Sequence, residues 1–261
     1  MDRATSPSSS GICVITAGGP YPWIIINALG EKFGPIDVLM EEPEPRSLFL
    51  KRRARKIGWF ATSGQFATMM LVRLGKKRFA TRIERIVAEN GLEEEPRPEH
   101  KVVDIGSINS GKCLDALKRL DPKVVLLAGC RIVKPEILSQ VRCPVLNYHA
   151  GINPQYRGMN GGYWALASGD PGNFGTTVHL VDAGIDTGGI LYQVRGKPAP
   201  DDNIMTYAHR LAALSRDMCT RAVGDALSGK LTTVASDGPS RQWYHPTIWQ
   251  YLATGFTRGV W

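Results

Sequence analysis

Short apolar runs alternate with amphipathic stretches along most of the chain, and this alternation constrains the fold more than any other feature. Apolar residues at helical spacing between these runs predict several helices. The first stops at Gly30, and others cover 113–120 and 134–141. Continuous apolar strands joined through helices are typical of parallel sheets covered on both faces, so we predict an α/β fold of that kind. The predicted strands are 11–19, 36–40, 101–109, 123–129 and 143–151.

The second half of the chain has a different pattern. Two strand-like runs flank DAGIDTGG within residues 175–194, which predicts antiparallel pairing around an acidic loop. A long amphipathic helix is predicted over 203–228, with a strand over 230–236 after it.

A basic segment at about 45–92 separates the second and third predicted strands. Its runs KRRARK and KKRFATRIER carry most of the excess of 32 Lys and Arg over 24 Asp and Glu, a net charge of +8. We interpret the segment as a basic helical insertion. It is either a solvated face that covers the edge of the sheet or a docking surface for an anionic substrate or membrane phosphates.

The rest of the composition is ordinary for a globular protein. Hydrophobic residues make up 43% of the chain, yet no apolar run is long enough to span a bilayer. Residues 1–10 lack the apolar centre of a signal peptide, so we predict a disordered tail and a cytoplasmic location. The cysteines form neither CxxC pairs nor clusters with His, which predicts free thiols and no metal site. They are Cys13, Cys113, Cys130, Cys143 and Cys219.

Two polar side chains close the fifth predicted strand. Asn147 and His149 are two residues apart, so their side chains share one face of the strand. Ligands bind at the carboxyl ends of parallel strands, and Asp186 ends the acidic loop farther on. Asn, His and Asp together form a constellation suited to acyl transfer, although strand capping and a simple turn explain the same residues.

Three segments carry a resemblance to a known family. The stretches VVLLAGCRIVKPEIL (124–138), LNYHAGINPQYRGMNGGYWAL (146–166) and GTTVHLVDAGIDTGGILYQ (175–193) resemble the signatures of the folate-dependent formyltransferases. The resemblance runs continuously over about 101–195, although AGIN (150–153) stands where the related signature has an apolar Leu-Leu after the His. It implies a Rossmann-like catalytic domain of the formyltransferase type over 11–200, with 201–261 as a C-terminal helix and short aromatic extension.

The resemblance implies a role for each matching residue. Asn147 and His149 would hold the oxyanion that develops on the formyl group of 10-formyltetrahydrofolate, and His149 would also help to move a proton. Asp186 would orient His149 and a bound water and assist removal of the proton from the attacking amine. Fixed donors aimed at the oxyanion lower the barrier, and a His beside a carboxylate suits the proton transfer.

The resemblance also implies where the folate binds. Its pterin would dock against the backbone near Arg131, Ile132 and Val133. The other side of the pocket would be the loop at 180–186, which includes Val181 and Asp182.

The family includes enzymes that formylate glycinamide ribonucleotide, methionyl-tRNA and nucleotide-linked amino sugars. TAGGPYPW, after the first strand, does not match the Gly-Ser-Asn phosphate loop of the glycinamide ribonucleotide enzymes. About thirty residues follow the helix that ends near Ser228, too few for the tRNA-binding domain of the methionyl-tRNA enzymes. We therefore expect a nucleotide-linked amino sugar as the acceptor and no nucleic-acid partner.

Other interpretations stay open. The acceptor could be methionyl-tRNA, glycinamide ribonucleotide or an amino-acid precursor, or the protein could be an inactive folate-binding relic. The aromatic tail at 241–261 is interpreted as packing on the core or on a second subunit, which leaves a homodimer through the C-terminal extension open. Contact between the basic insertion and a membrane surface is open as well.

Overall fold

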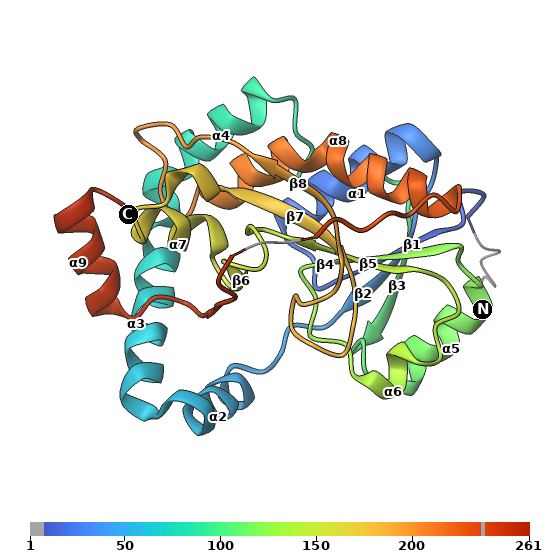
Figure 1. The fold of residues 1–261 in the computed structure, drawn as a ribbon, viewed down its shortest axis with the longest axis horizontal. Coiled ribbons are helices and arrows are strands. Elements are labelled where there is room, and N and C mark those ends of the chain that lie inside the picture. Colours follow the sequence, from blue (N-terminus) through green and yellow to red (C-terminus); the bar gives the residue numbers. More distant parts are fainter. Residues whose placement is uncertain (1–7, 236–237) are drawn as a thin grey trace.

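The computed structural model describes residues 8–235 and 238–261, and its centre is a seven-stranded sheet in the order β3-β2-β1-β4-β5-β7-β8 (Figure 1). The first five strands in this order are parallel, and β5–β7 and β7–β8 are antiparallel, which confirms both predicted patterns. The strands are β1 Ile12–Thr16, β2 Asp37–Glu41, β3 Lys101–Gly106, β4 Val124–Ala128, β5 Val145–His149, β7 Gly175–Leu180 and β8 Ile190–Arg195. A separate parallel pair joins β6 (Arg157–Gly158) to β9 (Gln242–Trp243).

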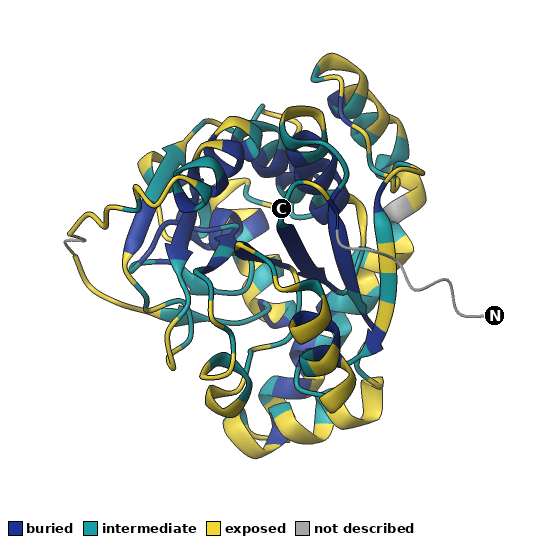
Figure 2. Cartoon of the chain, turned by 90° about the vertical axis from the view of Figure 1, so that its right-hand side faces the viewer, coloured by how far each residue is buried: buried dark blue, intermediate teal, exposed yellow. Residues whose placement is uncertain are grey.

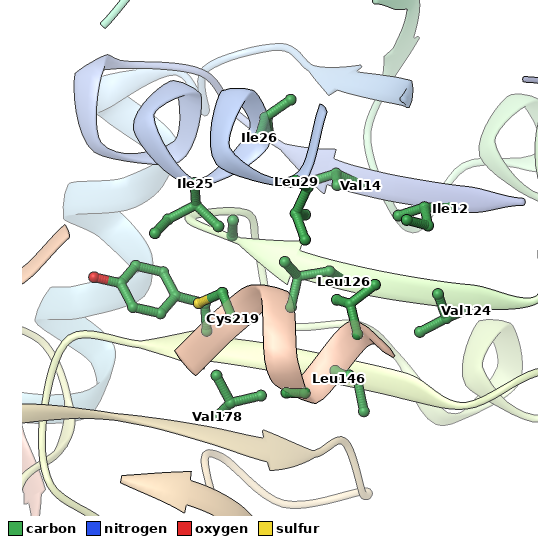
Figure 3. Packing of buried hydrophobic residues seen from close by; sticks show 14 of the residues in the cluster. Ile12, Val14, Ile25, Ile26, Leu29, Val124, Leu126, Leu146, Val178 and Cys219 are labelled. Atoms are coloured by element: carbon green, nitrogen blue, oxygen red, sulfur yellow. The ribbon is translucent and has the colours of Figure 1, made fainter. Parts of the chain in front are cut away.

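Helices cover both faces of the sheet, as predicted. On one face, α1 and α8 pack over apolar side chains that include Val14, Leu126 and Leu146 (Figure 3). On the other face, residues of α5 and α6 pack over the alternate side chains of β1 and β4. The central strands are therefore buried, and exposed residues lie on the outer faces of the helices (Figure 2). The helices are α1 Pro20–Phe33, α2 Arg46–Ile57, α3 Trp59–Gly75, α4 Ala80–Glu89, α5 Gly111–Leu120, α6 Pro135–Leu138, α7 Gly161–Ala167, α8 Tyr207–Leu227 and α9 Ile248–Arg258, with short 3-10 turns at Lys76–Phe79 and Pro171–Asn173.

Helix α1 does not stop at Gly30 as predicted. It continues to Phe33 and ends at Gly34, which has a positive φ of 85°. A Cβ at Gly30 would lie 2.5 Å from Cε1 of His100. This glycine therefore allows close packing inside the helix, and Gly34 is the residue that terminates it.

The basic segment forms the predicted helical insertion, but it does not cover the edge of the sheet. Helix α3 packs against α9 and α4 packs against α8, while α2 packs on α3 and extends from the body of the protein (Figure 1). The edge strand β3 remains accessible, and Val102 on it is 44% exposed.

The segment after α8 also differs from prediction. Within the described part of 230–236, Val234 makes one isolated bridge to Ile190, so the predicted strand does not form. At the other end of the chain, residues 1–7 of the predicted tail lie outside the described residues. Ser8 is buried, and its backbone N–H donates to the Asp37 carboxylate at 2.8 Å.

The aromatic tail is divided between core and surface. Trp243 stacks on Trp164 at a centroid distance of 4.5 Å, which confirms the predicted packing for this part of the tail. In contrast, Phe256 is 79% exposed, and Trp249 stacks on the exposed Phe60 of α3.

Candidate active site

The end of β5 places Asn147 and His149 on one face of the sheet, as predicted. Parallel pairing to β4 and antiparallel pairing to β7 hold the strand on both sides. His179 of β7 lies directly opposite Asn147 in this register. The site therefore lies where the parallel part of the sheet changes to the antiparallel part, at the carboxyl end of β5.

The side-chain amide of Asn147 is fully engaged. Its Nδ2 donates to Oδ1 of Asp186 at 3.1 Å and lies 3.0 Å from Nε2 of His179. Nδ1 of His179 lies 2.7 Å from the carbonyl oxygen of Leu180 and donates to it, so Nε2 of the neutral ring accepts from Asn147. The two hydrogens of one amide thus connect β5, β7 and the acidic loop.

Asp186 is the charged centre of the site. Burial alone would raise the pKa of its carboxyl group, but the positive charge that His149 and His179 carry when protonated, together with the Gly158 N–H, outweighs burial and holds this pKa well below the usual range. The Gly158 N–H donates to Oδ2 at 2.9 Å. Asp186 is therefore ionised at neutral pH, with donors or rings on both of its oxygens.

His149 is oriented by its backbone acceptor. The ring is buried, and Nε2 lies 2.7 Å from the carbonyl oxygen of Tyr156, so Nε2 carries a hydrogen and donates it. Nδ1 faces Oδ2 of Asp186 at 3.7 Å. The nitrogen that can take up a proton therefore faces the carboxylate that would stabilise the resulting cation.

Two residues of the 146–166 segment hold the backbone of the acidic loop. Asp186 has a positive φ of 51°. The Arg157 guanidinium donates to the carbonyl oxygen of Ile185 at 2.6 Å, and the Asn153 amide donates to that of Asp186 at 3.1 Å. These bonds stabilise a conformation that is rare for residues other than glycine.

A family model described as "Formyl transferase" matches residues 85–223, which is more than half of the chain. The chain belongs to the formyl transferase family. This confirms the resemblance seen in the sequence.

One of three relatives compared with the chain is a curated protein. The methionyl-tRNA formyltransferase of Kosmotoga olearia is 27% identical over 175 residues, which are 67% of this chain and 53% of that protein. The chain thus spans about half the length of the curated relatives it matches.

The other two relatives are solved structures. Phosphoribosylglycinamide formyltransferase from Anaplasma phagocytophilum superposes with a TM-score of 0.55 at 17% identity, over 91% of this chain and all of that chain (100%). An N-formyltransferase from Helicobacter canadensis, in complex with folinic acid and dTDP-3-aminofucose, has a TM-score of 0.54 at 13% identity, over 89% and 70% of the two chains. At these identities the likeness shows a shared Rossmann-like fold.

The residues predicted to bind folate lie on two segments beside the sheet. The Arg131 side chain is committed to the protein, because its guanidinium donates to Glu41 at 2.9 Å and to the carbonyl oxygen of Glu42 at 2.6 Å. Ile132 is 60% exposed, and Val133 packs on the core. The side chains of Arg131 and Val133 are therefore held by the protein, and the Ile132 side chain and the backbone of this segment are left to face a ligand.

The opposite segment contains Val181 and Asp182. Val181 packs against the same core as Val133. The exposed Asp182 accepts from the Gly184 N–H at 2.9 Å and from the Thr187 hydroxyl at 2.7 Å, which closes the loop that leads to Asp186.

Sequence reasoning missed His179, Asn153 and the role of Gly158. His179 lies inside a segment that was singled out, but its contact with Asn147 follows from the β5–β7 register, which no pattern in the sequence specifies. Asn153 stands in AGIN, where the family resemblance leads one to expect a leucine. A polar residue at an expected apolar position was the available signal.

Two further observations concern the described residues. Within 8–235 and 238–261, no group of three or more His, Cys, Asp or Glu side chains is arranged to hold a metal ion. None of the helices in these ranges has the length and apolar character needed to cross a bilayer.

Proposed function

We propose that the chain transfers a formyl group from 10-formyltetrahydrofolate to a primary amine, with Asn147, His149 and Asp186 as the catalytic residues. The observation that carries the proposal is the ionised Asp186, which receives the Asn147 amide and faces Nδ1 of His149. Membership of the formyl transferase family supports the same activity.

The reaction begins at the amine of the acceptor and uses His149 and Asp186 for the proton transfer. The amine nitrogen attacks the formyl carbon, and the carbonyl electrons move onto the formyl oxygen. The nitrogen then loses a proton to Nδ1 of His149, where Asp186 stabilises the imidazolium. Collapse of the oxyanion breaks the bond between the formyl carbon and N10 of the folate, and the proton that His149 took up is returned to N10 as tetrahydrofolate leaves.

Asn147 must release a hydrogen to act on the oxyanion, because both amide hydrogens are already donated. The bond to the Asp186 carboxylate is charge-assisted, whereas the bond to His179 joins two neutral groups and is weaker. We therefore assign the hydrogen that faces His179 to the formyl oxygen.

The backbone of the 131–133 segment suits a pterin. The N–H of Ile132 and the carbonyl oxygen of Val133 have no hydrogen-bond partner among the described residues. A pterin edge presents both donors and acceptors, and flexible side chains are not needed to bind it. Val181 and Asp182 would form the other side of this pocket.

A nucleotide-linked amino sugar is the acceptor we propose. The Helicobacter canadensis structure contains such a sugar nucleotide, and it shares this fold. Methionyl-tRNA is the second candidate, because the matching curated relatives act on it according to their names. Five free thiols suit a reducing compartment, and we propose the cytoplasm.

A panel of amines tests the activity and separates these acceptors. The purified protein is mixed with 10-formyltetrahydrofolate and with 3-amino and 4-amino nucleotide sugars, glycinamide ribonucleotide or methionyl-tRNA. Mass spectrometry then detects formylated products. We expect a formylated nucleotide sugar, whereas formylation of methionyl-tRNA alone would refute the sugar assignment.

We also propose that α2 and the start of α3 contact an anionic membrane surface. Trp59 and Phe60 are 66% and 77% exposed, directly after a helix that carries six Lys or Arg and no acidic residue. Exposed aromatic rings beside cations suit the interface of an anionic bilayer.

Vesicle sedimentation tests this contact. Binding to vesicles with anionic lipid, and its loss in the double variant Trp59→Ser and Phe60→Ser, is expected. The contradicting result is that the protein does not bind vesicles but forms a dimer, and that Phe256→Ser abolishes this dimer. The exposed aromatic side chains would then join two copies of the chain.

A further inference from the structure

Arg53 is a half-buried cation that forms no ion pair among the described residues, although Glu44 acts on its guanidinium from a longer distance. Its guanidinium lies 3.6 Å from Sδ of Met159, and it stacks over the Tyr244 ring at 4.3 Å and the Phe49 ring at 5.3 Å. Its neighbour Arg52, in contrast, pairs with Glu44 at 2.9 Å. Burial of Arg53 lowers the pKa of its guanidinium, so an anion placed beside it would be favoured.

His245 adds a neutral donor to this cation. The Asn160 amide donates to Nδ1 of His245 at 2.9 Å, so the neutral ring carries its hydrogen on Nε2. Burial, together with the charge of Arg53, lowers the pKa of His245 to about 4. The Nε2–H has no acceptor in the part of the chain that the structure describes. Lys56, one helical turn after Arg53, lies 5.3 Å from the centroid of the Tyr244 ring.

Two consecutive residues, Gly158 and Met159, connect this cluster to the Asp186 carboxylate. Arg53 touches Met159, and Met159 follows Gly158, whose N–H donates to Asp186. Consecutive Cα atoms are about 3.8 Å apart, so the guanidinium and the carboxylate lie within roughly 15 Å of each other. An acceptor with its amine at Asp186 can therefore extend a second group toward Arg53.

The start of α1 is poorly equipped for a phosphate. The free N–H groups of a helix N-terminus commonly bind phosphate, but Pro20 and Pro22 remove two of them from the first turn. The Trp23 N–H is within hydrogen-bond reach of the Gly19 carbonyl oxygen. A phosphate-bearing acceptor thus needs donors from another part of the chain.

We propose that Arg53, Lys56 and His245 form the subsite for the phosphate groups of the acceptor, a nucleoside diphosphate carrying the amine. This inference rests on the proposed formyl transfer and names what that reaction recognises. Arg53 is a planar bidentate donor suited to phosphate, Lys56 adds charge, and His245 adds an uncharged N–H. The basic insertion thereby contributes directly to the acceptor side of the site.

Calorimetric titration with uridine diphosphate and with inorganic pyrophosphate, at fixed ionic strength, tests the subsite. Arg53→Gln is expected to weaken binding of both probes at least about tenfold, as for the loss of a charge-assisted bidentate pair. Arg55→Gln removes the same charge from an exposed position of α2 and should change affinity less than about twofold. Equal weakening in the two variants, or no binding of either probe by the unmodified protein, overturns the proposal.

Four measurements keep this outcome separate from failure of the proposed function. Binding of 5-formyltetrahydrofolate and the thermal midpoint should be unchanged in Arg53→Gln, and Arg53→Lys should restore part of the diphosphate affinity. With an active acceptor, Arg53→Gln should raise KM for that acceptor more than it lowers kcat. Diphosphate binding that depends on Arg53, without formyl transfer to any amine, would support the subsite and refute the proposed activity. Formyl transfer with an unchanged KM in Arg53→Gln would support the activity and refute the subsite.

Discussion

Replacing Asp186 by Asn removes one charge at nearly constant shape. The carboxylate accepts from the Asn147 amide on Oδ1 and from the Gly158 N–H on Oδ2. An amide has only one acceptor oxygen, so in either orientation its NH₂ group faces one of these donors. Because a hydrogen bond to a charged group contributes about 1.5–3 kcal/mol, Asp186→Asn should lower the free energy of unfolding by about 2–3 kcal/mol.

The effect on the reaction should be larger. Without the carboxylate, a proton on Nδ1 of His149 has no counter-charge, and the Asn147 amide loses its anchor. Loss of one preorganised group of this kind costs about 100- to 1000-fold in kcat, or roughly 3–4 kcal/mol of activation free energy. Urea unfolding gives the stability, and the rate of formyl transfer under saturating substrates gives kcat.

Asp115→Asn is the matched control, because Asp115 is exposed on α5. It should leave the free energy of unfolding and kcat within experimental error.

The lowered pKa of Asp186 also predicts a pH dependence. The stabilisation by this carboxylate is complete above its unfolded pKa of about 4 and is lost as the pH falls below that value. An Asp186→Asn protein as stable and as active as the parent would refute the reasoning.

Three further predictions concern residues around the site. Gly158→Ala should destabilise the protein by more than about 2 kcal/mol in urea unfolding, because Gly158 has a φ of 96° and a Cβ there would lie 2.3 Å from the Trp243 carbonyl oxygen; unchanged stability would contradict this. Asn153→Leu should lower kcat about tenfold while folate binding, measured by fluorescence, persists, because Asp186 loses a bond that holds its backbone; an unchanged kcat would show that this bond is dispensable. Since the pKa of His245 is about 4 when folded and about 6.5 when unfolded, stability should fall by on the order of 2 kcal/mol as pH decreases from about 6.5 to 4, and the His245→Asn variant should show a smaller decrease.

Local sequence patterns were sufficient for the main elements of the fold. The apolar runs of β1 and β4 are buried throughout, so hydrophobicity alone identifies them as central strands. Gly30 was misread because a glycine that ends a helix and one that permits close packing are identical in sequence. Only the contact with His100 distinguishes them.

The part of the site that depends on local sequence could be predicted. Asn147 and His149 share a face because they are two residues apart on one strand, which is a local property. Their contacts with His179 and Gly158 depend on strand register and on a loop that returns from a distant part of the chain. Arg53 is farther still in the sequence, and its contact with Met159 depends on an insertion whose direction no periodicity specifies.

The most direct test of the account follows an isotope-labelled formyl group from 10-formyltetrahydrofolate to the best amine of the panel. We expect the label in the amine product for the unmodified protein. In His149→Ala the label should stay on the folate, while folate binding is retained. Labelled product formed at the same rate in His149→Ala, or no labelled product with any amine, would contradict the assignment of His149 and its partners Asn147 and Asp186 as the catalytic centre.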